Sequence, residues 1–244
     1  MADDLFGGHA ALYASVRPSY PPELIDWVAA QCQNRSRALD VATGNGQAAR
    51  DLAEHFDDVV AIDVSDAQLR EAKPHPRIRY AVASAESTGL ADRSVDLVAA
   101  AQALHWFENA AFSAELTRVL RPGGVFAAWG YAFFHIDDDV DSVLRLAVLD
   151  VIEPYWPARS RVLWDGWTSV TLPGTPIETP SFEMNEVVTL DSLWKFMSSW
   201  SGWQRAVAAG VAVDAGRELV EEVWGDGSPR TKRTPLIFRA TRLG

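Results

Sequence analysis

The residues best suited to chemistry lie in a short glycine-containing run, LDVATGNG at residues 39–46. Gly44 and Gly46 permit backbone conformations closed to other residues, and they let a ligand approach the main chain closely. Asp63 follows at the end of the next apolar run. In open α/β sheets an acid at that place commonly binds ribose hydroxyls. The arrangement indicates a nucleoside-containing cofactor, although a tight turn with a capping acid would have the same pattern.

Two kinds of cofactor fit this loop. The spacing of Gly44, Gly46 and Ala49 also satisfies the dinucleotide fingerprint G-x-G-x-x-G/A, so an NAD(P)-dependent oxidoreductase stays open from the loop alone. No second nucleotide-binding half is recognisable further along the chain.

The elements that must position this loop form an alternating series. Apolar, β-branched runs predict strands that are buried on both faces, as in a parallel sheet covered by helices. These runs are 37–42, 59–63, 78–83, 95–100 and 125–130, with a final one at 236–241. Helix-period segments lie between them, for example Asp66–Lys73 with Ser65 as its N-cap. The fold class predicted is a doubly wound, Rossmann-like α/β sheet.

The second half of the chain has a different texture. After Tyr131, residues 137–151 have a helical pattern, and the stretch that follows, to Pro180, is rich in Trp, Pro and Gly. Residues 193–223 are mostly helical in pattern, with a possible strand at 182–189. We therefore expect a helical, Trp-rich cap. The expected organisation is an N-terminal lid and first helix (1–36), a cofactor-binding core (37–130), a cap insertion (131–180) and the remaining strands with cap helices (181–244).

Several motifs occur in the order of one known family. They are LDVATGNG at 39–46, AID at 61–63, SAE at 84–86, the segment 94–107 and RVLRPGG at 118–124. Together they resemble the class I S-adenosyl-L-methionine (SAM) methyltransferases, specifically the small-molecule type 11 domain. The resemblance implies a seven-stranded, mostly parallel sheet whose last strand is antiparallel, and it favours SAM over a nicotinamide cofactor.

The resemblance also assigns the cofactor contacts. The implied set is Asp40, Ala42, Gly44, Asn45, Gly46, Asp63, Val64, Ala85, Glu86 and Gln102. By this resemblance, Asp40 and Gly44–Gly46 contact the methionine part of SAM. Asp63 binds the ribose hydroxyls, and Ala85 and Glu86 contact the adenine. The chain departs from the family at Ala42, where relatives have glycine, and at Ser84, where many relatives have an acid. Glu86 is either an adenine contact or a solvated loop residue.

The candidate acceptor residues are Tyr13, Arg17 and His105. The runs 6–21 and 102–107 resemble a subgroup that includes trans-aconitate methyltransferases, in which the N-terminal segment folds over the cofactor. Arg17 could bind a carboxylate of the acceptor or of SAM, or could stack on a tyrosine at the surface. His105 could act as a base, orient the acceptor, or be a packed structural histidine. A carboxylate acceptor is already ionised and needs no base.

Ten tryptophans are the unusual feature of the composition. Six of them fall between Trp156 and Trp203, within the expected cap. They either fill the core of the cap or line a dry aromatic pocket that binds a flat acceptor or a sulfonium cation.

Charge and composition exclude other classes. A net charge of −11 disfavours binding to the phosphate backbone of DNA or RNA, so no nucleic-acid partner is expected. One cysteine fits a reducing cytoplasm, no secretory signal or membrane span is visible, and the scattered histidines predict no metal. The expected function is methyl transfer to a small molecule, or SAM binding without turnover. The sequence names neither the acceptor nor the oligomeric state.

Overall fold

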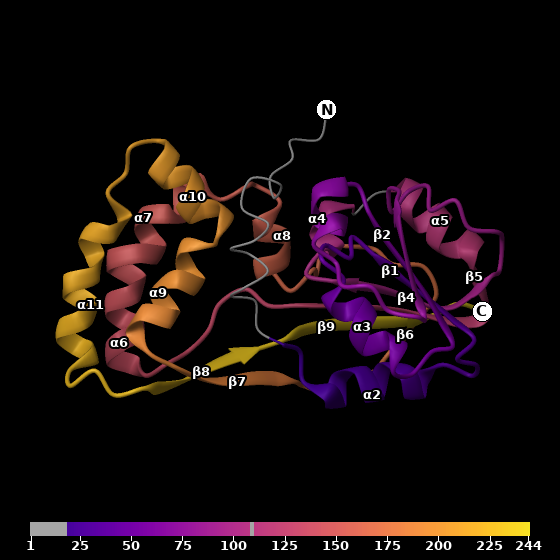
Figure 1. Ribbon diagram of the computed structural model, residues 1–244, viewed down its shortest axis with the longest axis horizontal. Coiled ribbons are helices and arrows are strands. Elements are labelled where there is room, and N and C mark those ends of the chain that lie inside the picture. Colours follow the sequence, from indigo (N-terminus) through magenta and orange to yellow (C-terminus); the bar gives the residue numbers. More distant parts are fainter. Residues whose placement is uncertain (1–18, 108–109) are drawn as a thin grey trace.

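The computed structural model describes residues 19–107 and 110–244, and a seven-stranded sheet organises one of its two lobes (Figure 1). Its strands, in spatial order, are β3 (Ile78–Val82), β2 (Asp58–Asp63), β1 (Arg37–Val41), β4 (Val95–Ala101), β5 (Leu120–Gly130), β9 (Ile237–Arg242) and β6 (Thr175–Ile177). Neighbours from β3 to β5 pair in parallel, whereas β9 is antiparallel to both β5 and β6. The predicted fold class and its antiparallel last strand are confirmed.

Helices cover both faces of this sheet. They are α2 (Pro22–Gln31), α3 (Gln47–Ala53), α4 (Asp66–Arg70), α5 (Ala110–Val119) and α8 (Ser160–Trp164). Leu24 of α2 and Leu52 of α3 share one apolar cluster with Leu97 of β4. On the other face, Leu116 of α5 and Leu163 of α8 share a second cluster with strands β1, β2, β4 and β5. Burial on both faces explains why the strands lack polar alternation.

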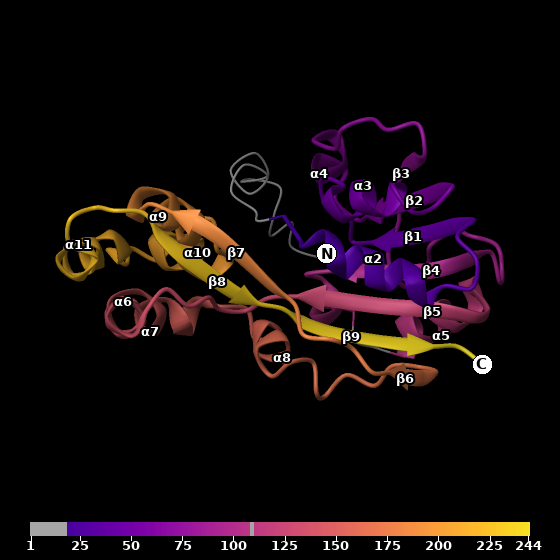
Figure 2. The same cartoon turned by 90° about the horizontal axis from the view of Figure 1, so that it is seen from below.

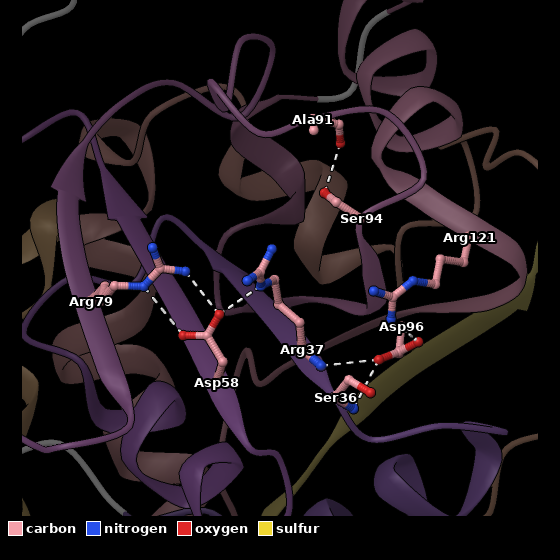
Figure 3. Close-up of polar contacts among 8 residues, drawn as sticks. All are labelled: Ser36, Arg37, Asp58, Arg79, Ala91, Ser94, Asp96 and Arg121. Atoms are coloured by element: carbon pink, nitrogen blue, oxygen red, sulfur yellow. Dashed lines mark hydrogen bonds and ion pairs between the residues drawn. The ribbon is translucent and has the colours of Figure 1, made fainter.

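The amino edge of the sheet is closed by ion pairs (Figure 3). Asp96, at the start of β4, is 4% exposed and accepts hydrogen bonds from the backbone N–H groups of Ser36 and Arg37, each at 2.9 Å. Arg121 donates to its other oxygen at 2.5 Å. Asp58 is bound in the same region by Arg37 and Arg79. Because these charges satisfy one another, chemistry is expected at the opposite, carboxyl edge.

The cap forms a second lobe beside that carboxyl edge (Figures 1 and 2). Its helices are α6 (Asp138–Leu144), a π-helical turn (Arg145–Leu149), α7 (Asp150–Ile152), α9 (Leu190–Ser198), α10 (Ser201–Ala208) and α11 (Arg217–Trp224). Short 3₁₀ turns lie at Leu104–Trp106, Glu153–Tyr155 and Val213–Gly216. Buried residues from these cap helices form a separate core.

A two-stranded ribbon joins the lobes. β7 (Glu183–Val188) pairs antiparallel with β8 (Arg230–Pro235), and β8 is followed directly by β9 of the main sheet. His135, after β5, adds a bridge to Arg233 of β8. The possible strand at 182–189 therefore exists, but it belongs to this ribbon and not to the main sheet. The seventh sheet strand is β6, three residues within the Pro- and Gly-rich stretch where only cap was expected.

Candidate cofactor and acceptor site

The loop between β1 and α3 turns sharply at the carboxyl edge of the sheet. Three of its residues have positive φ: Ala42 at 54°, Gly44 at 58° and Gly46 at 79°. The turn is closed by Gly46 N–H, which donates to the carbonyl of Thr43 at 3.0 Å. Ala42 replaces the usual glycine yet keeps a left-handed backbone, which costs an L-residue about 1–2 kcal/mol. The turn therefore accommodates alanine at this position.

The two glycines are required for different reasons. A side chain at Gly44 would enter nearly open space, because among the described residues only the Gln68 amide oxygen lies within 4 Å, at 3.8 Å. A side chain at Gly46 would collide with the Tyr80 ring, whose Cε1 lies 2.7 Å from that position. Gly44 thus leaves room above the loop for a ligand, whereas Gly46 lets β3 approach it.

Asp63 ties the loops after β1 and β2 together. Its Oδ2 accepts from the backbone N–H of Gly44 at 2.8 Å, and its Oδ1 accepts from that of Ser65 at 2.8 Å. Each oxygen retains a lone pair, so the carboxylate can still accept from ribose hydroxyls. The next residue, Val64, is 65% exposed, which is unusual for valine beside a buried strand.

Asp40 carries a buried charge beneath the same loop. It is 1% exposed, and its Oδ2 accepts from the Thr43 hydroxyl at 2.5 Å. Burial raises the pKa of Asp40 to about 7, and the nearby Asp63 raises it further against the lowering effect of the Thr43 hydrogen bond. Its Oδ1 is buried and makes no hydrogen bond of ordinary geometry among the residues described, although the nearby backbone N–H of Ala49 lowers the pKa of this carboxyl.

The loop after β3 carries the expected adenine contacts. Ala85 is 8% exposed and packs in the sheet core, whereas Glu86 is half-buried. Ser84 and Ser87 form a small antiparallel bridge around them. At the start of this loop, the backbone N–H of Ala83 donates to the carbonyl of Asp63 at 3.1 Å. The loop after β3 therefore lies next to the loop after β2.

Gln102 has a structural role that its position in the motif did not reveal. Its side-chain amide donates to the carbonyl of Tyr131 at 2.9 Å and accepts from the Tyr131 N–H at 2.8 Å. The side chain thereby extends the pairing of β4 with β5 by one step, at a backbone φ of 57°. A side chain at Gly130 would collide with it. Because this amide is engaged, Gln102 would meet a cofactor through its remaining surface.

His105 lies in the Leu104–Trp106 turn at the end of β4 and is 4% exposed. Its ring contacts that of Trp106, with centroids 4.8 Å apart. Arg159, just before α8, donates to the carbonyl of Trp106 and so joins this turn to the second half of the chain. The other acceptor candidates, Tyr13 and Arg17, lie outside the described residues, as does the lid expected before residue 19.

The cap contributes aromatic residues that motif reading could not assign. Phe133 and Trp164 have ring centroids 5.4 Å apart, and Trp164 and Trp156 lie 5.7 Å apart. Together with Leu149 and Arg145 of the π-helical turn, these rings line a hollow of about 210 Å³. Asp150 and Glu153 complete its lining. The clustering of tryptophans was the only signal in the sequence for this pocket.

These features fit SAM on the evidence of the chain itself. Among the described residues, the glycine loop has space above Gly44, an exposed valine follows Asp63, and the buried Oδ1 of Asp40 suits a cationic ligand. SAM carries a positively charged sulfonium and an ammonium group. These charges complement the carboxylate of Asp40, whose ionised form is disfavoured by burial when no cation is near. Asp40, Gly44, Asp63, Val64 and Ala85 would hold it.

Comparisons with known proteins agree with this arrangement. The Methyltransf_11 family, described as a methyltransferase domain, matches residues 39–128. An uncharacterised methyltransferase-like protein of Schizosaccharomyces pombe is 30% identical over 204 residues, which is 80% of this chain and 77% of that protein. A protein of Dictyostelium discoideum named as a methyltransferase is 29% identical over 212 residues, covering 85% and 81% of the two chains.

A solved structure adds support across both lobes. A protein from Anaeromyxobacter dehalogenans, named as a type II methyltransferase, superposes with a TM-score of 0.85 at 37% identity, covering 93% of this chain and 97% of that one. The chain belongs to this methyltransferase family. It is a SAM-dependent methyltransferase, and the nicotinamide alternative is not favoured.

No helix within 19–107 or 110–244 is long and apolar enough to cross a membrane. In the same part of the chain, no group of three His, Cys, Asp or Glu side chains is arranged to hold a metal ion.

Proposed function

We propose that this enzyme transfers the methyl group of SAM to a small molecule, and that the methylated group is a carboxylate. The observation that carries the proposal is the aromatic hollow lined by Phe133, Trp156 and Trp164. SAM, when bound, supplies an electrophilic methyl group. The chain's own contribution is to hold the acceptor, exclude water and align the acceptor with that methyl group.

The position of the hollow supports this assignment. Phe133 follows β5 by three residues, so it lies close to the carboxyl edge where the cofactor loops meet. α8 supplies Trp164 to the hollow, and Arg159, just before α8, bonds the turn that holds His105. The wall opposite contains a π-helical turn, a feature that often marks functional sites. A volume of about 210 Å³ suits part of a small molecule.

One cation on the rim of the hollow can bind an acid, although the carboxylates of Asp150 and Glu153 also line it. Arg145 is highly exposed, and the Oδ1 of Asp150 lies 3.9 Å from its Nε, which leaves its other N–H groups available to an acidic group of the acceptor. Glu153 is already paired with Arg161. An ionised carboxylate needs no proton removed, which agrees with a His105 that is almost fully buried. Tyr13, Arg17 and His105 stay candidates for positioning the acceptor, as in the trans-aconitate subgroup.

The wider assignments follow the same proposal. We place the enzyme in the cytoplasm, since its single cysteine, Cys32, is buried and unpaired by any disulfide. The net charge of −11 argues against nucleic acid as the acceptor. We further propose that 37–130 forms the cofactor-binding core and that 131–180 supplies the wall of the acceptor pocket.

The test is incubation of the protein with methyl-labelled SAM and a panel of small acids, phenols and amines matched in size. The expected product is a methyl ester, which mild alkali hydrolyses to release labelled methanol. Alkali-stable product would overturn the carboxylate assignment while keeping the methyltransferase. Tight binding of S-adenosylhomocysteine (SAH) with no product from any acceptor would favour SAM binding without turnover.

Two leucines of the π-helical turn give a matched pair of variants. Leu149 lines the hollow, whereas Leu146, three residues earlier, is 70% exposed. Leu149→Ala should raise the acceptor KM about 5–30-fold by removing apolar contact of about 1–2 kcal/mol. Leu146→Ala should leave that KM unchanged. Equal effects of the two changes would remove the acceptor from this hollow.

A further inference from the structure

The loop after β3, residues 84–92, is held in place by side chains of α5. Thr88 is 7% exposed, and both its backbone N–H and its hydroxyl donate to Oε1 of Glu115, at 2.8 and 2.6 Å. The Thr88 oxygen in turn accepts from the N–H of Leu90 at 3.2 Å. A carboxylate from a helix therefore replaces the partners that this loop would otherwise find in water.

Arg118, one turn along α5, completes the arrangement. Its guanidinium donates to both oxygens of Glu115, at 2.7 and 2.8 Å. The same side chain donates to the carbonyl of Leu90 and to the carboxylate of Asp92, each at 2.7 Å. This paired geometry uses the planar fork of arginine, which lysine cannot reproduce. We call Thr88, Glu115 and Arg118 the α5 brace.

The helix that carries the brace is itself fixed to the sheet. Phe112, Leu116 and Val119 of α5 are each at most 2% exposed, and they share a core with Ala85 from the loop. The hydrogen bond and ion pair with Arg118 lower the pKa of Glu115 to about 2, with burial acting in the opposite direction. Glu115 therefore stays ionised, and the brace stays formed, throughout the pH range of activity measurements.

We propose that Glu115 and Arg118 are positioning residues that hold loop 84–92 in the shape that binds the adenine end of SAM. The inference rests on the proposed SAM-dependent function and on the assignment of Ala85 and Glu86 to the adenine edge, and it adds residues that act through the loop. Fixing backbone costs about 1–2 kcal/mol per residue. A loop ordered before binding avoids that cost when the cofactor arrives. The brace should therefore act on cofactor affinity and not on acceptor binding.

The test measures SAH binding by calorimetry, together with hydrogen exchange of residues 84–92 in the free protein. Glu115→Gln should raise the SAH dissociation constant about 10–50-fold and should speed exchange in the loop, because the charge-assisted bonds to Arg118 and Thr88 are weakened. Thr88→Val is the milder variant and should raise it about 3–10-fold. The matched control is Glu221→Gln in α11, which removes an Arg–Glu helix pair, at 2.8 Å from Arg217, in the cap.

A nucleoside fragment separates positioning from general damage. 5′-Methylthioadenosine contains the adenosine half of SAH without its amino-acid end, so it should lose affinity by the same factor as SAH. Unchanged affinities with unchanged loop exchange in both brace variants would overturn the proposal. So would a loss seen for SAH but not for the fragment, or an equal loss in Glu221→Gln. Neither readout needs an acceptor, so the result is independent of ester formation.

Discussion

The two lobes of this enzyme are stabilised internally by different kinds of interaction. At the carboxyl edge of the sheet, side-chain carboxylates fix the loops: Asp63 holds two backbone N–H groups and Glu115 holds Thr88. In the cap, aromatic rings contact one another, as Trp156 does with Trp164 and Trp200. Directional hydrogen bonds define one geometry, whereas ring packing accepts several. The loops of the sheet lobe are therefore held in one geometry, whereas the cap core can be packed in more than one way, and we expect the cap to specify the acceptor.

The largest expected effect tests whether the cap core is separate from the cofactor site. Trp224 is 2% exposed in the cap core, with its indole N–H donating to the Ser228 carbonyl at 3.0 Å. Trp224→Ala should lower the free energy of unfolding by about 3–5 kcal/mol, through lost burial and a cavity. Denaturant unfolding measures this change, and calorimetry should find SAH affinity within about twofold of the parent. A parallel loss of SAH binding would show that the lobes are not separable.

The corresponding change in the sheet lobe removes the hydrogen bonds that Asp63 accepts from the backbone. Asp63→Ala should weaken SAH binding about 100-fold or more, because the Gly44 and Ser65 N–H groups and the ribose hydroxyls lose one shared acceptor. The control is Asp66→Ala, three residues on, whose exposed side chain pairs only with Arg70 among the described residues. Similar affinities for the two variants would contradict the assignment of Asp63 to the ribose.

How far the sequence could predict the molecule differs between the same two lobes. The apolar strand runs determined the sheet because burial on both faces leaves a continuous signal, and the glycine loop was recognisable because its backbone shape demands glycine. β6 escaped prediction since three residues at a sheet edge, one of them Pro176, carry almost no pattern. The pairing of β7 with β8 escaped because ribbon partners lie more than 40 residues apart.

The site shows the same division. Asp63 could be assigned from spacing, but the engagement of Gln102 with Tyr131 depends on two strand ends meeting, which no local pattern encodes. Glu115 was not singled out at all, and Arg118 was noticed only as part of RVLRPGG. In the cap, the number of tryptophans predicted an aromatic cluster. The sequence could not predict which rings line the hollow, because that depends on tertiary packing.

The titration of Asp40 provides a pH test that the cap should not influence. The pKa of Asp40 is raised to about 7 from 3.8, so the folded protein holds a proton that the unfolded chain releases. Asp40 therefore lowers stability progressively as pH rises from about 4 to about 7, with no further loss above. A cationic ligand favours the ionised form, so SAM affinity should rise about tenfold between pH 6 and pH 8. Calorimetry across that range measures the rise.

The matching variant for that titration is Asp40→Asn. It retains the shape of the side chain but cannot ionise, so both the pH dependence of SAM affinity and the loss of stability between pH 4 and pH 7 should flatten. Trp224→Ala, which lies in the other lobe, should keep the full pH dependence. A slope that survives in Asp40→Asn would assign the titration to another group.

The smallest expected effect concerns two exposed valines, one in each region. Val64 is 65% exposed beside Asp63, and Val187 is 76% exposed on β7 of the ribbon. Val64→Ala should weaken SAH binding about 2–5-fold, because about 0.5–1 kcal/mol of apolar contact with the cofactor is lost. Val187→Ala should leave SAH binding unchanged, and neither change should alter the unfolding free energy by more than about 0.5 kcal/mol. Since both side chains face outward in the free protein, only a ligand can distinguish them, and equal SAH affinities would remove Val64 from the cofactor site.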